Sequence, residues 1–280
     1  MVNQTNNILK NLILSSRPKQ WTKNLLVFLA LFFSLNEAWE ISNIDDFLLR
    51  LTKTTISFFI FCFLSSSIYL INDSLDKDKD ILHPQKYKRP IASGVLSIKT
   101  AIITSLILGI ISITSAFYLN KNFGIISVTY ISIMFFYSIY LKKFIILDVL
   151  IISLGFVLRT ISGAIVIDVP ISNWLYICTG IGALFIALSK RRSELDSGGE
   201  NIIQQRQTLQ LYNTRQLDVS MLICGILVLT SYTLYTIQAT NLPNNNIMLV
   251  TVPFVLLGLI RYSYLTIYKK LGQTPENIIT

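Results

Sequence analysis

The run TTISFFIFCFLSSSIYLI, residues 54–71, contains only apolar and small hydroxylated residues, and the acidic repeat NDSLDKDKD, residues 72–80, follows it directly. A helix of roughly 20 predominantly apolar residues crosses a bilayer core, so this run has the length and composition of a membrane span. The chain of 280 residues is 52% hydrophobic and only 14% charged, whereas soluble domains carry roughly 25% charged residues. The sequence therefore predicts an all-α, polytopic membrane protein.

Eight apolar runs are predicted to span the membrane. Short polar stretches separate most of them, so we expect a single integral membrane domain over residues 1–280 rather than several soluble domains. The predicted spans are centred in Trp21–Leu35, Thr54–Ile71, Lys99–Leu119, Phe123–Leu141, Leu147–Ile167, Ser172–Ser189, Leu217–Gln238 and Ile247–Tyr268.

The net charge of +9 is better explained by membrane orientation and anionic lipid than by nucleic acid, and we expect no nucleic-acid partner. A cytoplasmic N-terminus gives cytoplasmic loops their usual excess of Lys and Arg, and the opposite orientation would reverse it. The two long polar connections, residues 72–97 and 190–216, then face the cytoplasm. The basic residues left outside or within spans are Arg50, Lys53, Lys121, Arg159 and Arg261.

The acidic repeat has the spacing of a metal site. On a continuing helix Asp73, Asp76 and Asp80 line one face, because they are three and four residues apart, and Asn72 adjoins Asp76 one turn later. Three carboxylates beside a bilayer repel one another unless a divalent cation neutralises them, and hard oxygen ligands suit Mg²⁺. The alternative is a solvated acidic helix end that forms ordinary surface pairs with neighbouring lysines.

Basic residues follow the repeat at Lys86, Lys88 and Arg89. Lys88 and Arg89 are candidate phosphate ligands. Arg89 is the better one, because Pro90 fixes the chain after it and a guanidinium binds phosphate bidentately. His83, which precedes a proline, is expected to be a loop residue rather than a catalytic base.

These segments resemble a known family. NDSLDKDKD matches the NDxxDxxxD motif of the UbiA superfamily of intramembrane prenyltransferases, and RPIASG, residues 89–94, resembles the segment that follows it. Together with RPKQWTKN, residues 17–24, the run is most similar to the branch of decaprenyl-phosphate phosphoribosyltransferases, and the likeness extends from Arg17 to Thr280. The branch has nine spans, and GQTPENIIT, residues 272–280, resembles the linker into the ninth, so we expect that the last helix of the family is absent from this sequence.

The resemblance adds candidate residues after the fourth predicted span. The branch carries a similar YSxxLK segment near its phosphate site, which makes Tyr137 and Lys142 candidate substrate-binding residues. Asp148 and Arg159 are ionisable residues within a span, and such residues usually face a cavity or a partner. They lie about three turns apart along one helix, so we expect no direct pair between them, and Arg159 is a further candidate for substrate binding.

The second long connection departs from the aromatic-acceptor members of the superfamily. Those members typically have a second Asp-rich motif here, whereas this sequence places Lys190, Arg191 and Arg192 before Glu194. A basic cluster suits additional phosphate groups of a sugar donor or a lipid acceptor, while a basic membrane rim is the alternative. Glu194 stays a possible metal ligand.

The resemblance and the basic cluster together imply an Mg²⁺-dependent transferase. It would move a 5-phosphoribosyl group from 5-phosphoribosyl 1-diphosphate to a polyprenyl phosphate and release pyrophosphate. Asp73, Asp76 and Asp80 would be the catalytic metal ligands, at the cytoplasmic face of a bacterial plasma membrane. One alternative is prenyl transfer from a prenyl diphosphate to an aromatic or other acceptor, and another is a non-catalytic membrane binder or transporter. The sequence does not indicate an oligomeric state.

Overall fold

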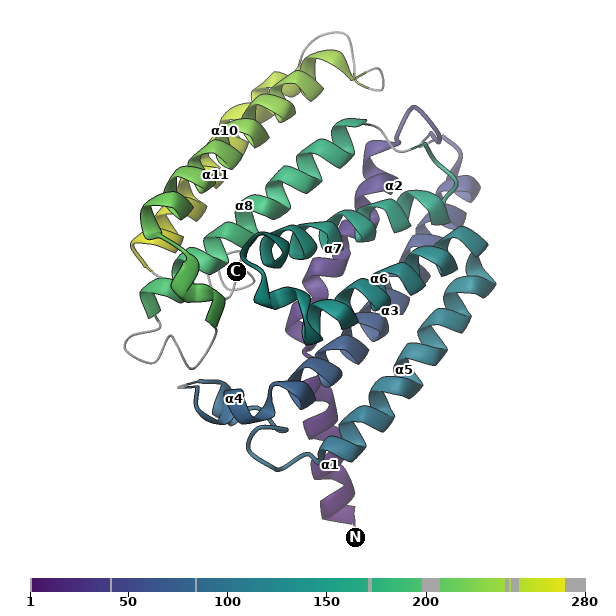
Figure 1. Ribbon diagram of the computed structural model, residues 1–280. Helices are drawn as coiled ribbons and strands as arrows, with labels where there is room; N and C mark the ends of the chain where they lie inside the picture. The colour runs from purple at the N-terminus through teal and green to yellow at the C-terminus, as the bar shows by residue number, and fades with distance from the viewer. Residues whose placement is uncertain are drawn as a thin grey trace.

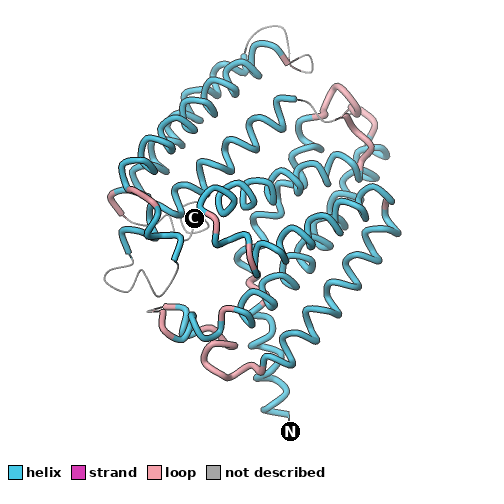
Figure 2. Tube along the Cα trace, in the orientation of Figure 1, coloured by secondary structure: helices cyan, strands magenta, loops and turns pink. Residues whose placement is uncertain are grey.

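The computed structural model describes residues 2–40, 42–83, 85–170, 173–197, 207–239, 242 and 247–269. Within these ranges the backbone forms helices joined by turns and loops, with one isolated bridge between Leu35 and Trp39 (Figure 2). The predicted all-α class is confirmed. The segment GQTPENIIT lies outside the described residues, as do residues 198–206 of the second long polar connection.

Seven helices of the described part are long and apolar enough to cross a membrane. They coincide with the second to eighth predicted spans. A helix satisfies its own backbone hydrogen bonds, as a chain in hydrocarbon must. Their bounds are α3 Ile44–Leu75, α5 Ile98–Leu119, α6 Lys121–Ile139, α7 Ile145–Val166, α8 Asn173–Ser197, α10 Thr214–Gln238 and α11 Val252–Ile267, the last preceded by the 3₁₀ helix η6 Ile247–Thr251.

The first predicted span, Trp21–Leu35, is not a continuous α-helix. The 3₁₀ helix η1 Pro18–Phe28 leads into the short helix α2 Leu29–Phe33. A 3₁₀ helix rises about 2 Å per residue against 1.5 Å for an α-helix, so the two elements together extend for about 30 Å, the thickness of a bilayer core. The first predicted span is thus formed by a 3₁₀ helix followed by a short α-helix, and not by one continuous α-helix.

Contacts with α3 and α7 hold η1 in place. A Cβ atom on Gly163 of α7 would lie 1.9 Å from the carbonyl oxygen of Val27, so only glycine permits the two backbones to approach this closely. The buried Asn24 donates from Nδ2 to Ser65 Oγ of α3 at 3.3 Å and accepts from Arg159 Nε of α7 at 2.7 Å. These contacts depend on tertiary packing, which the sequence pattern does not reveal.

The centre of the bundle is formed by α3 and α7, which are the most buried of the long helices, whereas α11 is the least buried. In Figure 1, α5 borders one edge, and α10 and α11 lie side by side beyond α8 at the other. The hydroxyls of Ser67 on α3 and Ser105 on α5 each donate to the other residue's carbonyl oxygen at 2.9 Å. Small residues of this kind let helices pack closely in lipid.

Short elements gather where α3 ends, which is the end predicted to face the cytoplasm. Figure 1 shows α1 and α4 at this end. The loops there contact one another, because Lys142 reaches Asp76 and the Tyr212 hydroxyl donates to the carbonyl oxygen of Ile145 at 2.6 Å. The elements are α1 Val2–Ser15, α4 Lys77–Ile81, η2 Lys86–Lys88, η3 Leu141–Lys143 and η5 Gln207–Leu211.

Candidate active site

The acidic repeat lies at a break between α3 and α4. Asn72 and Asp73 belong to the last turn of α3, Asp76 caps it with φ −95° and ψ 8°, and Asp80 lies on α4. The helix predicted to continue through the repeat is therefore interrupted at one residue, Asp76. Asn and Asp side chains, and that of Ser74 between them, compete with the backbone for hydrogen bonds and are poor helix formers. The break turns α4 away from the axis of α3.

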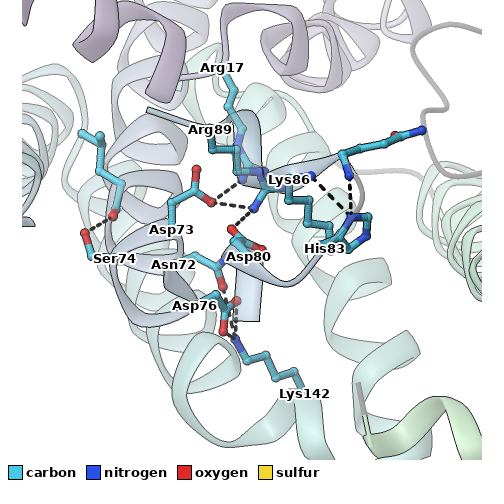
Figure 3. Close-up of polar contacts among 12 residues, drawn as sticks. Arg17, Asn72, Asp73, Ser74, Asp76, Asp80, His83, Lys86, Arg89 and Lys142 are labelled. Carbon is cyan, nitrogen blue, oxygen red and sulfur yellow. Dashed lines mark hydrogen bonds and ion pairs between the residues drawn. The ribbon is translucent and has the colours of Figure 1, made fainter. Parts of the chain in front are cut away.

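Asp73 and Asp80 are both buried, with only 2% and 4% of their surface exposed. One nitrogen, Nη1 of Arg89, donates to Asp73 Oδ1 at 3.0 Å and to Asp80 Oδ2 at 2.6 Å (Figure 3). Arg17, the residue before η1, donates to the same oxygen of Asp73. The two predicted carboxylates are therefore brought together around a shared cation.

Asp76 and Asn72 face a different cation. Lys142 of η3 contacts both carboxylate oxygens of Asp76, at 2.7 and 2.8 Å, and lies 3.5 Å from Asn72 Oδ1 (Figure 3). Within the described part of the chain, no three acidic, cysteine or histidine side chains converge closely enough to hold a metal ion. The predicted grouping of Asp73, Asp76 and Asp80 around one metal is thus not formed in this state.

The pair Asp73 and Asp80 nevertheless has the chemistry of a divalent-cation site. A small ion at the position of Arg89 Nη1 would contact an oxygen of each carboxylate. The nitrogen–oxygen distances of 3.0 and 2.6 Å exceed the roughly 2.0–2.1 Å of Mg²⁺–oxygen bonds, so the carboxylates would have to close in. Burial raises the pKa of the Asp80 carboxyl, and the nearby charges of Arg89 and Lys86 oppose that rise.

His83 shapes the first loop. Its Nδ1 accepts from the backbone N–H groups of Gln85 at 3.1 Å and Lys86 at 3.4 Å, which is the role of a loop residue. Burial, followed by the charges of Lys86 and Arg89, lowers its pKa to about 4, while Glu194 acts in the opposite direction.

The second connection begins at the end of α8, where Arg191 is completely buried. Its Nε lies 2.6 Å from Asp148 Oδ2 of α7, and its Nη1 pairs with Glu194. The Tyr137 hydroxyl donates to Asp148 Oδ1 at 2.9 Å. Arg191 and Tyr137 thus meet on one carboxylate, and their predicted role in substrate binding stays a prediction. Sequence spacing does indicate the Glu194 pair, but the contact with Asp148 needs the packing of α7 against α8.

Arg192 pairs with two carboxylates, Asp196 Oδ2 at 2.5 Å and Asp218 Oδ1 at 2.7 Å. The half-buried Lys190 lies on the same turn of α8. The expected basic cluster is therefore largely neutralised by acidic partners. A phosphate would have to compete with these partners for Arg191 and Arg192.

Two predicted residues lie apart from the carboxylates. Arg159 donates to Asn24, to the carbonyl oxygen of Gly155 at 2.7 Å and to the Tyr130 hydroxyl at 2.6 Å. Lys88 is exposed and stacks over the ring of its neighbour Tyr87, with Nζ 5.6 Å from the ring centre. The structure does not bring either side chain to the acidic repeat.

An apolar cavity of about 550 Å³ opens between η1, α2, α7, α8 and α10. It begins beside Thr22 and Lys23 of η1 and continues to Phe33 of α2 and Tyr235 of α10. The sequence pattern revealed neither the residues that line this cavity nor Arg17 as a site residue, although Arg17 lies in the RPKQWTKN run that carries the resemblance. The residues that line the cavity include Thr22, Lys23, Leu26, Phe33, Phe156 and Tyr235.

Residues 25–275 match the UbiA prenyltransferase family. The fold and this match define the chain as an integral membrane transferase. It belongs to the UbiA prenyltransferase family.

Similar proteins agree with this assignment. The chain is 33% identical to a decaprenyl-phosphate phosphoribosyltransferase from Mycolicibacterium smegmatis, over 75% of this chain and 65% of that protein's length. It is 27% identical to a decaprenyl-phosphate phosphoribosyltransferase from Mycobacterium tuberculosis, over 97% of this chain and 88% of that protein. The structure of a UbiA homologue from Archaeoglobus fulgidus bound to GPP and Mg²⁺ superimposes with a TM-score of 0.73 at 18% identity, over 96% of this chain and 95% of the other.

Proposed function

We propose that this transferase moves a 5-phosphoribosyl group from 5-phosphoribosyl 1-diphosphate to a polyprenyl phosphate and releases pyrophosphate. The buried pair of Asp73 and Asp80 around one guanidinium nitrogen carries the proposal, since both carboxylates already share one cationic partner there. The names of the relatives, decaprenyl-phosphate phosphoribosyltransferases, support this donor and this class of acceptor.

Asp73 and Asp80 would hold Mg²⁺, and Asp76 would join them once it releases Lys142. Bound there, Mg²⁺ supplies positive charge that neutralises the diphosphate leaving group. The Mg²⁺ present in the similar Archaeoglobus fulgidus structure supports a divalent metal in this fold.

The basic partners of the carboxylates would then bind donor phosphates. Arg17, Arg89 and Lys142 all end at the acidic repeat, so a short movement takes each from a carboxylate to a phosphate oxygen. Lys190 and Arg192 are further candidates at the second connection. Arg191 is held by Asp148 and pairs with Glu194.

The lipid acceptor would lie in the apolar cavity with its phosphate toward the acidic repeat. A phosphate oxygen of the acceptor attacks the anomeric carbon of the donor while the bond from that carbon to the diphosphate oxygen breaks. The acceptor is already an anion, so the reaction needs positioning and electrostatic stabilisation rather than a strong general base. The loop-forming role of His83 is consistent with this chemistry.

The setting that we propose is one integral domain in a bacterial plasma membrane, with the acidic repeat on the cytoplasmic side. The distribution of Lys and Arg supports this orientation, and the relatives come from bacteria.

The direct test is a transfer assay with the purified chain in detergent, Mg²⁺, ribose-labelled donor and a polyprenyl phosphate. We expect label in the lipid fraction and release of pyrophosphate. Label transfer that occurs only from a prenyl diphosphate to an aromatic acid would instead assign the chain to prenyl transfer. Absence of product with either substrate pair would favour a binder or transporter.

A further inference from the structure

The two faces of η1 have different surroundings. Asn24 and Val27 are buried in the bundle, whereas Lys23 and Leu26 line the apolar cavity. Among the described residues that line this cavity, none carries a carboxylate, and Lys23 contributes the positive charge. The cavity wall therefore combines an apolar surface with one ammonium group.

Lys23 lies deeper than the cytoplasmic rim. Trp21, two residues before it, donates from Nε1 to Ser66 Oγ of α3 at 3.1 Å. Ser66 is seven residues before Asp73, which is about 10 Å along an α-helix. A charged group at this depth is costly in an apolar environment, and such groups usually serve a substrate or ion path.

The ammonium of Lys23 is directed back toward the acidic repeat. Residues three apart in a 3₁₀ helix lie above one another, and Lys23 Nζ contacts Oε1 of Gln20, one turn nearer to the start of η1. Arg17 begins that end of η1 and pairs with Asp73. The ammonium thus lies between the apolar cavity and the carboxylates.

We propose that Lys23, assisted by Gln20, binds the phosphate of the isoprenoid lipid acceptor while the first part of its chain occupies the cavity. This inference rests on the proposed function, because it names the acceptor's own subsite. An ammonium–phosphate contact offsets the cost of holding the half-buried Lys23 charge in an apolar wall. A cavity of about 550 Å³ suits a ligand of ordinary drug size, so the rest of a long isoprenoid chain extends into the membrane.

The test is a binding experiment that does not depend on catalysis. Wild type, Lys23→Met and Lys23→Arg are titrated in detergent with farnesyl phosphate, with farnesol and with a short-chain phosphatidic acid. Lys19→Met is the matched control, because Lys19 lies exposed on the same helix and loses the same charge. We expect Lys23→Met to weaken binding of farnesyl phosphate by about tenfold to a hundredfold, with farnesol unchanged, and Lys23→Arg to restore much of it.

Equal affinity of wild type and Lys23→Met for farnesyl phosphate would overturn the inference. Lys23-dependent binding of phosphatidic acid as tight as that of farnesyl phosphate would also overturn it, since the site would then be one for membrane lipids in general. If wild type binds farnesyl phosphate through Lys23 but transfers no phosphoribosyl group, the proposed reaction fails and the lipid-phosphate site stands. In an active protein, Lys23→Met should raise KM for the lipid and leave KM for the donor unchanged; the reverse would contradict the assignment.

Discussion

Asp73 and Asp80 are buried carboxylates that arginines neutralise. Burying an ionised carboxylate is costly unless it is paired, and Arg17 and Arg89 supply the partners. The site is therefore balanced in charge without a metal. Metal and donor diphosphate together bring both signs of charge, so they can replace these pairs, with the metal on the carboxylates and the phosphates on the arginines.

Asp73→Asn should reduce kcat/KM for phosphoribosyl transfer by roughly 10²–10³-fold, because it removes the charge that would hold the metal at the leaving group in the proposed reaction. Asp78→Asn is the matched control, since Asp78 is an exposed member of the same acidic segment. Steady-state kinetics with labelled donor measure both variants, and thermal unfolding shows whether each is folded. Equal activity of the two variants would remove Asp73 from the site.

The pH dependence of stability should show the lowered pKa of His83. This pKa falls from 6.5 to about 4 because of burial and then of Lys86 and Arg89. Between about pH 4 and pH 6.5 the unfolded chain binds a proton at His83 that the folded chain does not. The contribution of His83 to the free energy of unfolding therefore rises with pH across this window and is complete above it. Protonation would also remove Nδ1 as an acceptor for two backbone N–H groups.

His83→Gln serves as the comparison. The difference in unfolding midpoint between wild type and variant should grow from pH 4 to pH 6.5 and stay constant above that. The pH profile of transfer above pH 6.5 should be the same in both. A difference in unfolding midpoint that shrinks as the pH rises would contradict a lowered pKa of His83 in the folded protein.

At the level of whole elements, η1 depends on the absence of a side chain at Gly163. Gly163→Ala would place a Cβ atom 1.9 Å from the carbonyl oxygen of Val27 and should destabilise the protein by about 3 kcal/mol. Gly182→Ala is the control, because a Cβ atom at Gly182 meets nothing within 4 Å. Thermal unfolding in detergent compares them, and similar midpoints would show that η1 does not pack on α7 as described.

The open space beside Gly182 also allows the cavity to be filled without a clash. Gly182 lines the cavity, so Gly182→Leu should raise KM for the polyprenyl phosphate roughly tenfold or more and leave KM for the donor unchanged. Gly258→Leu on α11 is the matched control, since Gly258 also has open space around it. Kinetics with both substrates varied separate the effects. A raised KM for the donor alone would place the donor in the cavity.

Across the whole molecule, local pattern predicted the long helices and the acidic repeat, because apolar length and carboxylate spacing are properties of the sequence itself. Packing decided the rest. The stretched η1 depends on Gly163 and Asn24, and the burial of Arg191 depends on Asp148 from another helix. Arg17 is distant from Asp73 in sequence and gave no chemical signal on its own. The sequence alone therefore does not reveal which side chains pair with these charged residues.

The charged residues of the acidic repeat and the apolar cavity both lie beside η1. Arg17, directly before η1, pairs with Asp73, and the cavity extends along η1 and α2 toward Phe33. A molecule with an anionic head and a long apolar chain matches this arrangement. On the proposed function, a water-soluble donor would enter from the loops around the acidic repeat and the lipid would enter from the membrane, so the two substrates would meet at the start of η1.

The most direct measurement is binding of Mn²⁺, as a spectroscopic substitute for Mg²⁺, in the presence of 5-phosphoribosyl 1-diphosphate and without lipid. Electron paramagnetic resonance should detect bound Mn²⁺ in wild type and in Asp78→Asn, and the signal should be lost in Asp73→Asn and in Asp80→Asn. Mn²⁺ binding that is independent of the donor diphosphate, or that survives in both variants of the buried pair, would contradict a metal–diphosphate site at Asp73 and Asp80.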